Sequence, residues 1–244
     1  MDAVLLRLRS RVEIWKGSDA WTEVHQEEDV APERLAILLC DLWDRHWCAG
    51  AARRVDEMAP RINTVLGAAR SCGVRIIHAP SETMAAYEGH AARRRALATA
   101  RTAPPAPLAL SDPPLPIDDS DGGCDSGEAP WYRAWTRQHS SIEIADTDFV
   151  SDDGREIYSV LCAEGIERLA IMGVHTNMCV LGRSFGIRQM ARWGVRCLLV
   201  RDLTDAMYNP ERHPYVSHAR GTELVVEHIE RHWCPSIRSG DLEG

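Results

Sequence analysis

The chain has 244 residues, and its hydrophobic share of 45% and charged share of 26% are ordinary for a globular protein. Its formal net charge of -8 excludes nucleic acid and anionic membranes as expected main partners. No apolar stretch approaches the roughly 20 residues that span a bilayer. The eight cysteines include no CxxC pair, and four of them (Cys40, Cys72, Cys162 and Cys197) lie in or beside apolar patterns. We therefore expect a cytoplasmic protein with reduced cysteines.

The first segment, residues 1–33, alternates apolar and polar residues, as in "VLLRLRSRVEIW". Such alternation predicts a strand or hairpin that extends the main fold. The main domain is expected over residues 34–244, and within it residues 80–140 interrupt the regular pattern. That stretch is first Arg-rich and helical, then rich in Pro, Gly and Asp, and it predicts an insertion that acts as a lid.

Short, continuous apolar runs predict buried strands in the main domain. These runs are "RLAILLCDLWD", "VRIIHAP", "SIEIA" (141–145), "RLAIMGV" and "VRCLLVRD". Helical spacing predicts helices over 55–72, 152–164 and 178–193, and a last one that includes "TELVVEHIERHW". Alternation of buried strands with helices predicts an α/β protein, a three-layer α/β/α sandwich with a mainly parallel, Rossmann-like sheet of six strands. Ligands of such sheets bind beyond the carboxyl ends of the strands.

Two candidate catalytic groups lie at predicted strand ends. In "GVHTNMCV", Cys179 stands where a strand passes into a helix, and unpaired N–H groups of a first helical turn favour a thiolate. Asp41 ends the first buried strand, closely followed by His46 and Cys48. A buried core cysteine and a loop-capping aspartate are the alternatives for the two residues.

The motifs "ILLCDLWD" and "GVHTNMCV" together resemble those of the isochorismatase-like cysteine hydrolases, which include nicotinamidase and N-carbamoylsarcosine amidohydrolase. A third match, "VRDLTDAMYN", places a strand-end acid at Asp202. The resemblance covers roughly residues 34–232 apart from the insertion. It implies the same sandwich fold and a small-molecule substrate, with no required cofactor, and it implies a homo-oligomer, either a dimer or a tetramer.

The resemblance also implies roles for individual residues. Cys179 would attack a carbonyl or amidine carbon, form a thioester-like intermediate and release ammonia or an amine, while Asp41 carries the proton. The family's cis peptide matches Val174–His175, and the backbone N–H groups of His175 and Cys179 would form the oxyanion hole. The implied function is hydrolysis of a C–N bond of the amide, urea or guanidino type.

One family residue is missing. The family lysine lies six residues before an aromatic residue, and counting back from Phe149 gives Glu143, while the only lysine of the chain is Lys16. A carboxylate at about 4 Å would disfavour the Cys179 thiolate by roughly 4 kcal/mol at an effective dielectric constant near 20. Glu143 is therefore a candidate catalytic residue that would change the mechanism.

Three arrangements would accommodate Glu143. An arginine, namely Arg183, Arg137 or Arg45, could supply the positive charge. Asp41 and Glu143 could share one proton. The two acids could instead bind a divalent metal or a cationic substrate. The sequence slightly favours the shared proton or the cationic substrate.

Further side chains are expected around the pocket. The candidate substrate-binding residues are Trp43, His46, His78, Arg183 and Trp135, and Trp47 and Trp131 are weighed equally as pocket or core residues. Candidate ligands of a divalent metal are His46, His78, Glu82 and His90, although the Asp-x-His arrangement of nicotinamidases is absent here.

Two other functions remain open. A catalytically silent member of the family would bind a ligand or a partner through the same pocket. A thiol oxidoreductase would need a resolving cysteine beside Cys179, and Cys40 and Cys48 are its topological neighbours.

Overall fold

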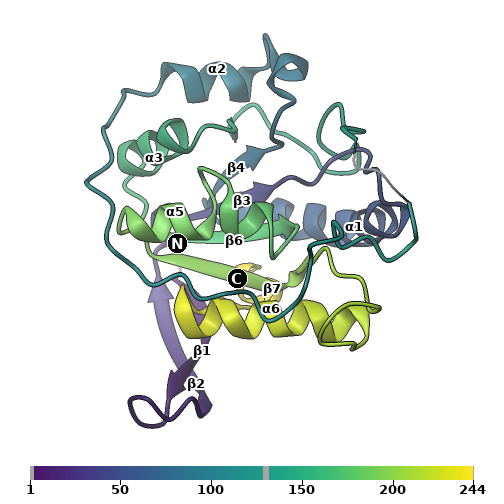
Figure 1. Ribbon diagram of the computed structural model, residues 1–244. Coiled ribbons are helices and arrows are strands. Elements are labelled where there is room, and N and C mark those ends of the chain that lie inside the picture. Colours follow the sequence, from purple (N-terminus) through teal and green to yellow (C-terminus); the bar gives the residue numbers. More distant parts are fainter. Residues whose placement is uncertain (1–2, 129–131, 244) are drawn as a thin grey trace.

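The computed structural model describes residues 3–128 and 132–243, and these form an eight-stranded sheet with helices on both faces (Figure 1). The strand order is β2-β1-β8-β7-β6-β3-β4-β5. The α/β class and the N-terminal β extension are confirmed, and the sheet is wider than the six strands expected. Within the described residues, no helix has both the length and the apolar character needed to cross a membrane.

The strands are β1 (Val4–Glu13), β2 (Trp21–Val30), β3 (Leu35–Cys40), β4 (Arg75–Ala79), β5 (Phe149–Val150), β6 (Arg168–Val174), β7 (Cys197–Asp205) and β8 (Ser236–Ile237). The α-helices are α1 (Ala49–Ser71), α2 (Ala91–Ala98), α3 (Gly154–Ala163), α4 (Cys179–Gly182), α5 (Ile187–Arg192) and α6 (His218–His232). Three 3-10 helices complete the list: η1 (Pro32–Arg34), η2 (Met84–Tyr87) and η3 (Ser239–Leu242).

The centre of the sheet is parallel and buried on both faces. Every residue of β3 and β6 is buried, and Leu38 of β3 pairs with Ile77 of β4 on one side and Ile171 of β6 on the other. Continuous burial explains why these strands read as unbroken apolar runs.

Two separate cores produce the three layers. On one face, α3, α5 and α6 contribute residues such as Ile157, Ile187 and Ile229. On the other face, α1 contributes residues such as Ile62 and Leu66. Each helix covers the sheet with its apolar stripe, so the strand ends stay free to form a site.

The N-terminal extension is an antiparallel hairpin of β1 and β2, and β1 also pairs with β8. Its attachment is partly ionic, because Arg9 Nε lies 2.7 Å from Glu230 Oε1 on α6, and Arg11 Nε lies 3.2 Å from Glu230 Oε2. The purple hairpin projects beyond the rest of the sheet in Figure 1.

The strand predicted at 141–145 is wrong. This stretch is irregular, and the strand at that edge is β5, which pairs with β4. Its backbone N–H groups donate to side chains: Glu143 N donates to Asn63 Oδ1 at 2.9 Å, and Ala145 N donates to Asp148 Oδ2 at 2.8 Å. Such bonds compete with a strand ladder for the same N–H groups.

The single helix predicted over 178–193 is also wrong, because the structure has α4 and α5 with a break between them. At the break, Gly186 lies so close to the preceding turn that a Cβ there would come within 2.9 Å of the carbonyl oxygens of Val180 and Leu181. Arg183 leaves the helix with a ψ of 160°. The break therefore changes the direction of the chain at Arg183.

Strand β7 runs past the predicted end at Asp202 and stops at Asp205. The register between β6 and β7 shifts between Ile171 and Gly173, and the irregularity lets the strand continue. Asp202 is exposed and bonds to Ser239, so the strand-end acid is Asp205.

The insertion contains η2, α2 and a long irregular segment that returns across the molecule, drawn in teal in Figure 1. Its backbone is held by contacts such as Leu108 N to Arg192 O at 2.8 Å. Among the cysteines expected in the core, Cys40 and Cys197 are buried, but Cys162 is exposed and Cys72 is only partly buried.

Candidate active site

A cavity of about 450 Å³ opens beyond the carboxyl ends of β3 and β6. Cys179, His175 and Arg183 line it from the β6 side, and Trp43 and His46 line it from the segment that follows β3. The position agrees with the rule for ligand sites of parallel sheets.

A thiol, a carboxyl group and a guanidinium lie close together at this edge of the sheet. Arg183 Nε donates to Asp41 Oδ2 at 2.9 Å, and the Cys179 thiol and the Asp41 carboxyl lie near enough for each to shift the pKa of the other. The second Arg183 arm lies 3.3 Å from Glu82 Oε1. Cys179 and Arg183 thus line the cavity, and the fully buried Asp41 carboxyl lies behind them, paired with Arg183.

Asp41 is completely buried and adopts a left-handed backbone conformation with φ 49°. Its Oδ1 accepts a hydrogen bond from Ser81 N at 2.7 Å. Burial raises the pKa of Asp41, and the opposing effect of Arg183 and these hydrogen bonds is smaller. The structure therefore makes Asp41 a better proton acceptor than an exposed aspartate.

The pKa of the Cys179 thiol is raised, first by burial and then by the charge of Asp41, while Arg183 opposes both effects. The expectation that a helix start would favour the thiolate is therefore not met. Helix α4 has only four residues, so few peptide dipoles add at its start. Burial and the neighbouring Asp41 charge therefore both favour the thiol form of Cys179 over the thiolate.

His175 follows β6, and the Val174–His175 peptide bond is cis. The His175 backbone N–H lies near enough to the Cys179 sulfur to lower the pKa of the thiol. The His175 ring is buried, and burial lowers its pKa to about 3, with further lowering by His46. His175 is one of the residues that line the cavity, and in the described part of the chain its buried Nε2 has no hydrogen-bond partner.

Aromatic rings form one wall of the cavity. The rings of Trp43 and Trp135 stack at 4.1 Å with an interplanar angle of 7°, and His46 stacks on Trp135 at 5.9 Å. Burial lowers the pKa of His46 to about 4, so both histidines of the site are neutral at physiological pH. Flat apolar surfaces and neutral imidazoles suit a flat substrate group.

Glu143 does not lie in the site, contrary to its expected role. It is exposed, its backbone N–H bonds to Asn63, and its carbonyl oxygen accepts from Arg70. The error follows from the strand wrongly placed at 141–145. Arg137 and Arg45 are exposed, and Arg183 is the arginine that reaches Asp41.

The candidate metal ligands do not converge in the described residues. His78 is buried outside the cavity, with Nδ1 2.9 Å from Gln138 Oε1 and Nε2 3.0 Å from Asp148 Oδ2. His90 caps α2 through its Nδ1. Both ring nitrogens of His78 are engaged by Gln138 and Asp148, so the substrate-binding role expected for His78 is also wrong. The candidate ligands therefore do not fit a metal at this cavity.

Sequence reasoning missed several contributors. Met178 and Met207 line the cavity, as does Gly122, and Ser81 supplies the amide that holds Asp41. Met207 follows the strand end at Asp205, so correct placement of that end would have indicated it. Trp47 lines the cavity, and Trp131 lies outside the described residues.

No family model matches the sequence, and no curated protein matches it. The fold is nevertheless similar to solved structures. One is a cysteine hydrolase from Pseudomonas syringae pv. phaseolicola 1448A, with a TM-score of 0.56 at 15% identity over 88% of this chain and 92% of that chain.

Two further structures have similar folds. An isochorismatase from Pseudomonas putida KT2440 gives a TM-score of 0.51 at 14% identity, over 86% of this chain and 91% of that chain. A pyrazinamidase of Pyrococcus horikoshii, solved in complex with zinc, gives 0.50 at 14% identity, over 84% of this chain and 99% of that chain. The resemblance expected from the motifs is confirmed at the level of the fold.

Proposed function

We propose that this protein hydrolyses a C–N bond of the amide, urea or guanidino type in a small molecule, with Cys179 as the nucleophile. The observation that carries the proposal is the contact of the Cys179 thiol with Asp41, which is itself paired with Arg183. Cysteine hydrolase and pyrazinamidase structures with the same fold support the reaction class.

The first step follows from the proton positions. As the sulfur attacks the substrate carbon, the thiol proton moves to the Asp41 carboxylate, because a preformed thiolate is disfavoured here. The Asp41 carboxyl then returns this proton to the leaving nitrogen, which departs as ammonia or an amine. Water then attacks the thioester-like intermediate while Asp41 takes one of its protons. The C–S bond breaks, the product leaves, and Asp41 passes the proton to the sulfur, which regenerates the thiol.

The oxyanion formed by each attack needs hydrogen-bond donors. The His175 N–H lies near the sulfur, and Cys179, whose N–H is the second donor, is the first residue of the short helix α4. Donors placed where charge develops typically contribute about 10²–10³-fold to the rate. These two amides are our proposed oxyanion hole.

Arg183 takes the place of the lysine on this proposal. Its guanidinium favours the ionised form of the Asp41 carboxylate and partly offsets the effect of burial on the pKa of Cys179. Glu82, which contacts the other arm of Arg183, is the acid available to a substrate cation. Glu82 therefore replaces Glu143 in the cationic-substrate arrangement.

The test is a screen for ammonia or amine release from amides, ureas and guanidino compounds, followed by trapping of the intermediate. We expect a substrate acyl group on the Cys179 peptide by mass spectrometry, and no turnover by Cys179→Ala. The exposed-thiol variant Cys162→Ser is the matched control and keeps full activity. Turnover that survives Cys179→Ala would exclude the proposed nucleophile.

A ligand-binding protein without turnover is the second candidate, favoured by the raised pKa of Cys179. It predicts that compounds of the same panel raise the Tm of the wild-type protein but are neither cleaved nor attached to the Cys179 peptide. Cleavage of any of them at a rate dependent on Cys179 decides for the enzyme.

A further inference from the structure

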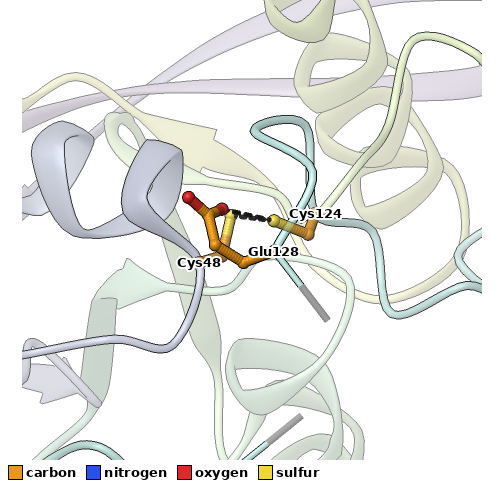
Figure 2. Close-up of side chains that lie close together, drawn as sticks. All are labelled: Cys48, Cys124 and Glu128. Atoms are coloured by element: carbon orange, nitrogen blue, oxygen red, sulfur yellow. Dashed lines mark hydrogen bonds between the residues drawn. The ribbon is translucent and has the colours of Figure 1, made fainter. Parts of the chain in front are cut away.

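Two cysteines lie together beside the site, outside the proposed catalytic groups. Cys48 is the N-cap of α1, and Cys124 belongs to the insertion segment 119–128 (Figure 2). Their sulfur atoms are 2.6 Å apart. Cys48 is completely buried, and Cys124 is 8% exposed.

Polar groups of the same segment surround the sulfur pair. Cys124 Sγ lies 3.3 Å from Glu128 Oε2, and Cys48 Sγ lies 3.3 Å from Ser126 Oγ. The two thiols and Glu128 place three metal-ligating atoms within 4.8 Å of one another. The cluster therefore has two chemical interpretations, a metal site or a disulfide.

The distance between the sulfurs decides between them. Two thiolates on one tetrahedral zinc, at Zn–S distances of about 2.3 Å, lie about 3.8 Å apart. A disulfide bond is about 2.05 Å long. At 2.6 Å the pair is about 0.5 Å from the bonded distance and over 1 Å too close for shared zinc, so a smaller movement forms the disulfide.

We propose that Cys48 and Cys124 are a redox-sensitive pair whose disulfide ties segment 119–128 to the start of α1. With a glutathione disulfide as oxidant, the Cys124 thiolate attacks one of its sulfurs and releases one glutathione thiolate. The Cys48 thiolate then attacks Cys124 of the mixed disulfide and releases the second. Two protein thiols and one oxidised glutathione give one protein disulfide and two reduced glutathiones.

The proposed disulfide would restrain residues that form a wall of the cavity. Gly122 lines the cavity, and a Cβ added to it would lie 3.4 Å from the Trp47 ring. Asp119 of the same segment accepts from Asn177, two residues before Cys179. Oxidation thus fixes a segment that contacts both the aromatic wall and the Cys179 loop.

The experiment treats the reduced full-length wild-type protein with oxidised glutathione, blocks the remaining thiols and maps the peptides without reductant. We expect one dominant cross-link, between the peptides containing Cys48 and Cys124, reversed by dithiothreitol. Burial and then Cys48 raise the pKa of the Cys124 thiol, so cross-linking should accelerate between pH 7 and 9. The oxidised protein should have a Tm higher by about 5–10 °C.

Matched variants locate the effect. Cys48→Ser and Cys124→Ser each abolish the cross-link and the Tm shift, whereas Cys72→Ser with Cys162→Ser keeps both, since those thiols lie elsewhere. The readouts do not depend on hydrolysis, so the proposal stands or falls separately from the proposed function. Full alkylation of both cysteines after oxidant, or one tightly bound zinc per chain lost from both single variants, would overturn it.

Discussion

The guanidinium of Arg183 reaches the buried carboxyl group of Asp41 across 2.9 Å, although 142 positions separate the two residues in the chain. The contact requires the break between α4 and α5, which releases Arg183 from a helix. Asp41 in turn contacts Cys179. One arginine thereby sets the charge balance of the proposed catalytic pair.

Replacement of Arg183 should remove most of the activity. Arg183→Ala leaves Asp41 without its cation, and we expect kcat/KM to fall by about 10²–10³-fold. Arg183→Lys keeps a charge but loses the forked contact with Asp41 and Glu82, so it should retain an intermediate activity. Steady-state kinetics on a substrate from the screen measures both effects.

The matched control is Arg188→Ala. Arg188 is similarly buried and also pairs with an acid, Asp112, at 3.0 Å, but it does not line the cavity. It should change kcat/KM by less than about threefold. Equal losses in the two variants would contradict the assignment of Arg183 to the site.

Asp41→Asn should separate thiol reactivity from hydrolysis. The charge of Asp41 raises the pKa of Cys179, so its removal lowers that pKa and should speed alkylation by iodoacetamide at pH 8 by about tenfold. Hydrolysis should fall by about 10²–10⁴-fold, because the proton carrier is lost. Peptide mass spectrometry against pH follows the alkylation.

Asp44→Asn is the control for that experiment. The Asp44 side chain bonds to Thr136, and Asp44 is not among the groups that shift the pKa of Cys179. Its alkylation profile should match the wild type. Slower alkylation of Asp41→Asn than of the wild type would show that Asp41 lowers the pKa of Cys179, which is the opposite of the expected effect.

Charge reversal at Glu143 should have little effect. Glu143 is exposed, and its backbone groups contact Asn63 and Arg70 away from the cavity, so Glu143→Lys should leave kcat/KM within about twofold. A change of tenfold or a shifted pH profile would place this side chain next to the reacting groups.

Loss of the aromatic wall should weaken substrate binding. Trp135→Ala removes the ring stacked on Trp43 and should raise KM at least about tenfold, whereas Trp135→Phe keeps a flat ring and should lose less. Because Trp135 is buried, the Tm of each variant is measured alongside. Tyr132→Ala, three residues earlier and 59% exposed, should leave KM unchanged.

Stability should depend on pH through His218 and Asp205. Burial alone would lower the pKa of His218, but the 2.8 Å hydrogen bond to Asp205 and the charge of Asp205 together outweigh burial and raise it above its usual value. The folded protein therefore gains stability from this pair below about pH 6.5 and loses it as pH rises through the raised pKa. His218→Gln should lower the Tm more at pH 6 than at pH 9, and an equal change at both would contradict the pairing.

Local sequence determined the elements whose signal lies in a few neighbouring residues. The runs that form β3, β4 and β6 are almost entirely buried and therefore mostly apolar, so the chain order alone predicted the parallel centre of the sheet. The ends of β3 and β6 then placed Asp41 and Cys179 at one edge.

Tertiary contacts decided the rest. The break before α5 depends on how closely Gly186 packs against the preceding turn, and the irregular stretch at Glu143 depends on side chains such as Asn63 that are distant in the chain. The sequence offered Arg183 as one of three candidate arginines and could not choose among them, and the approach of Cys124 to Cys48 leaves no local pattern. A sequence motif reports periodicity and turn chemistry, whereas charge compensation and burial depend on distances that exist only once the chain has folded.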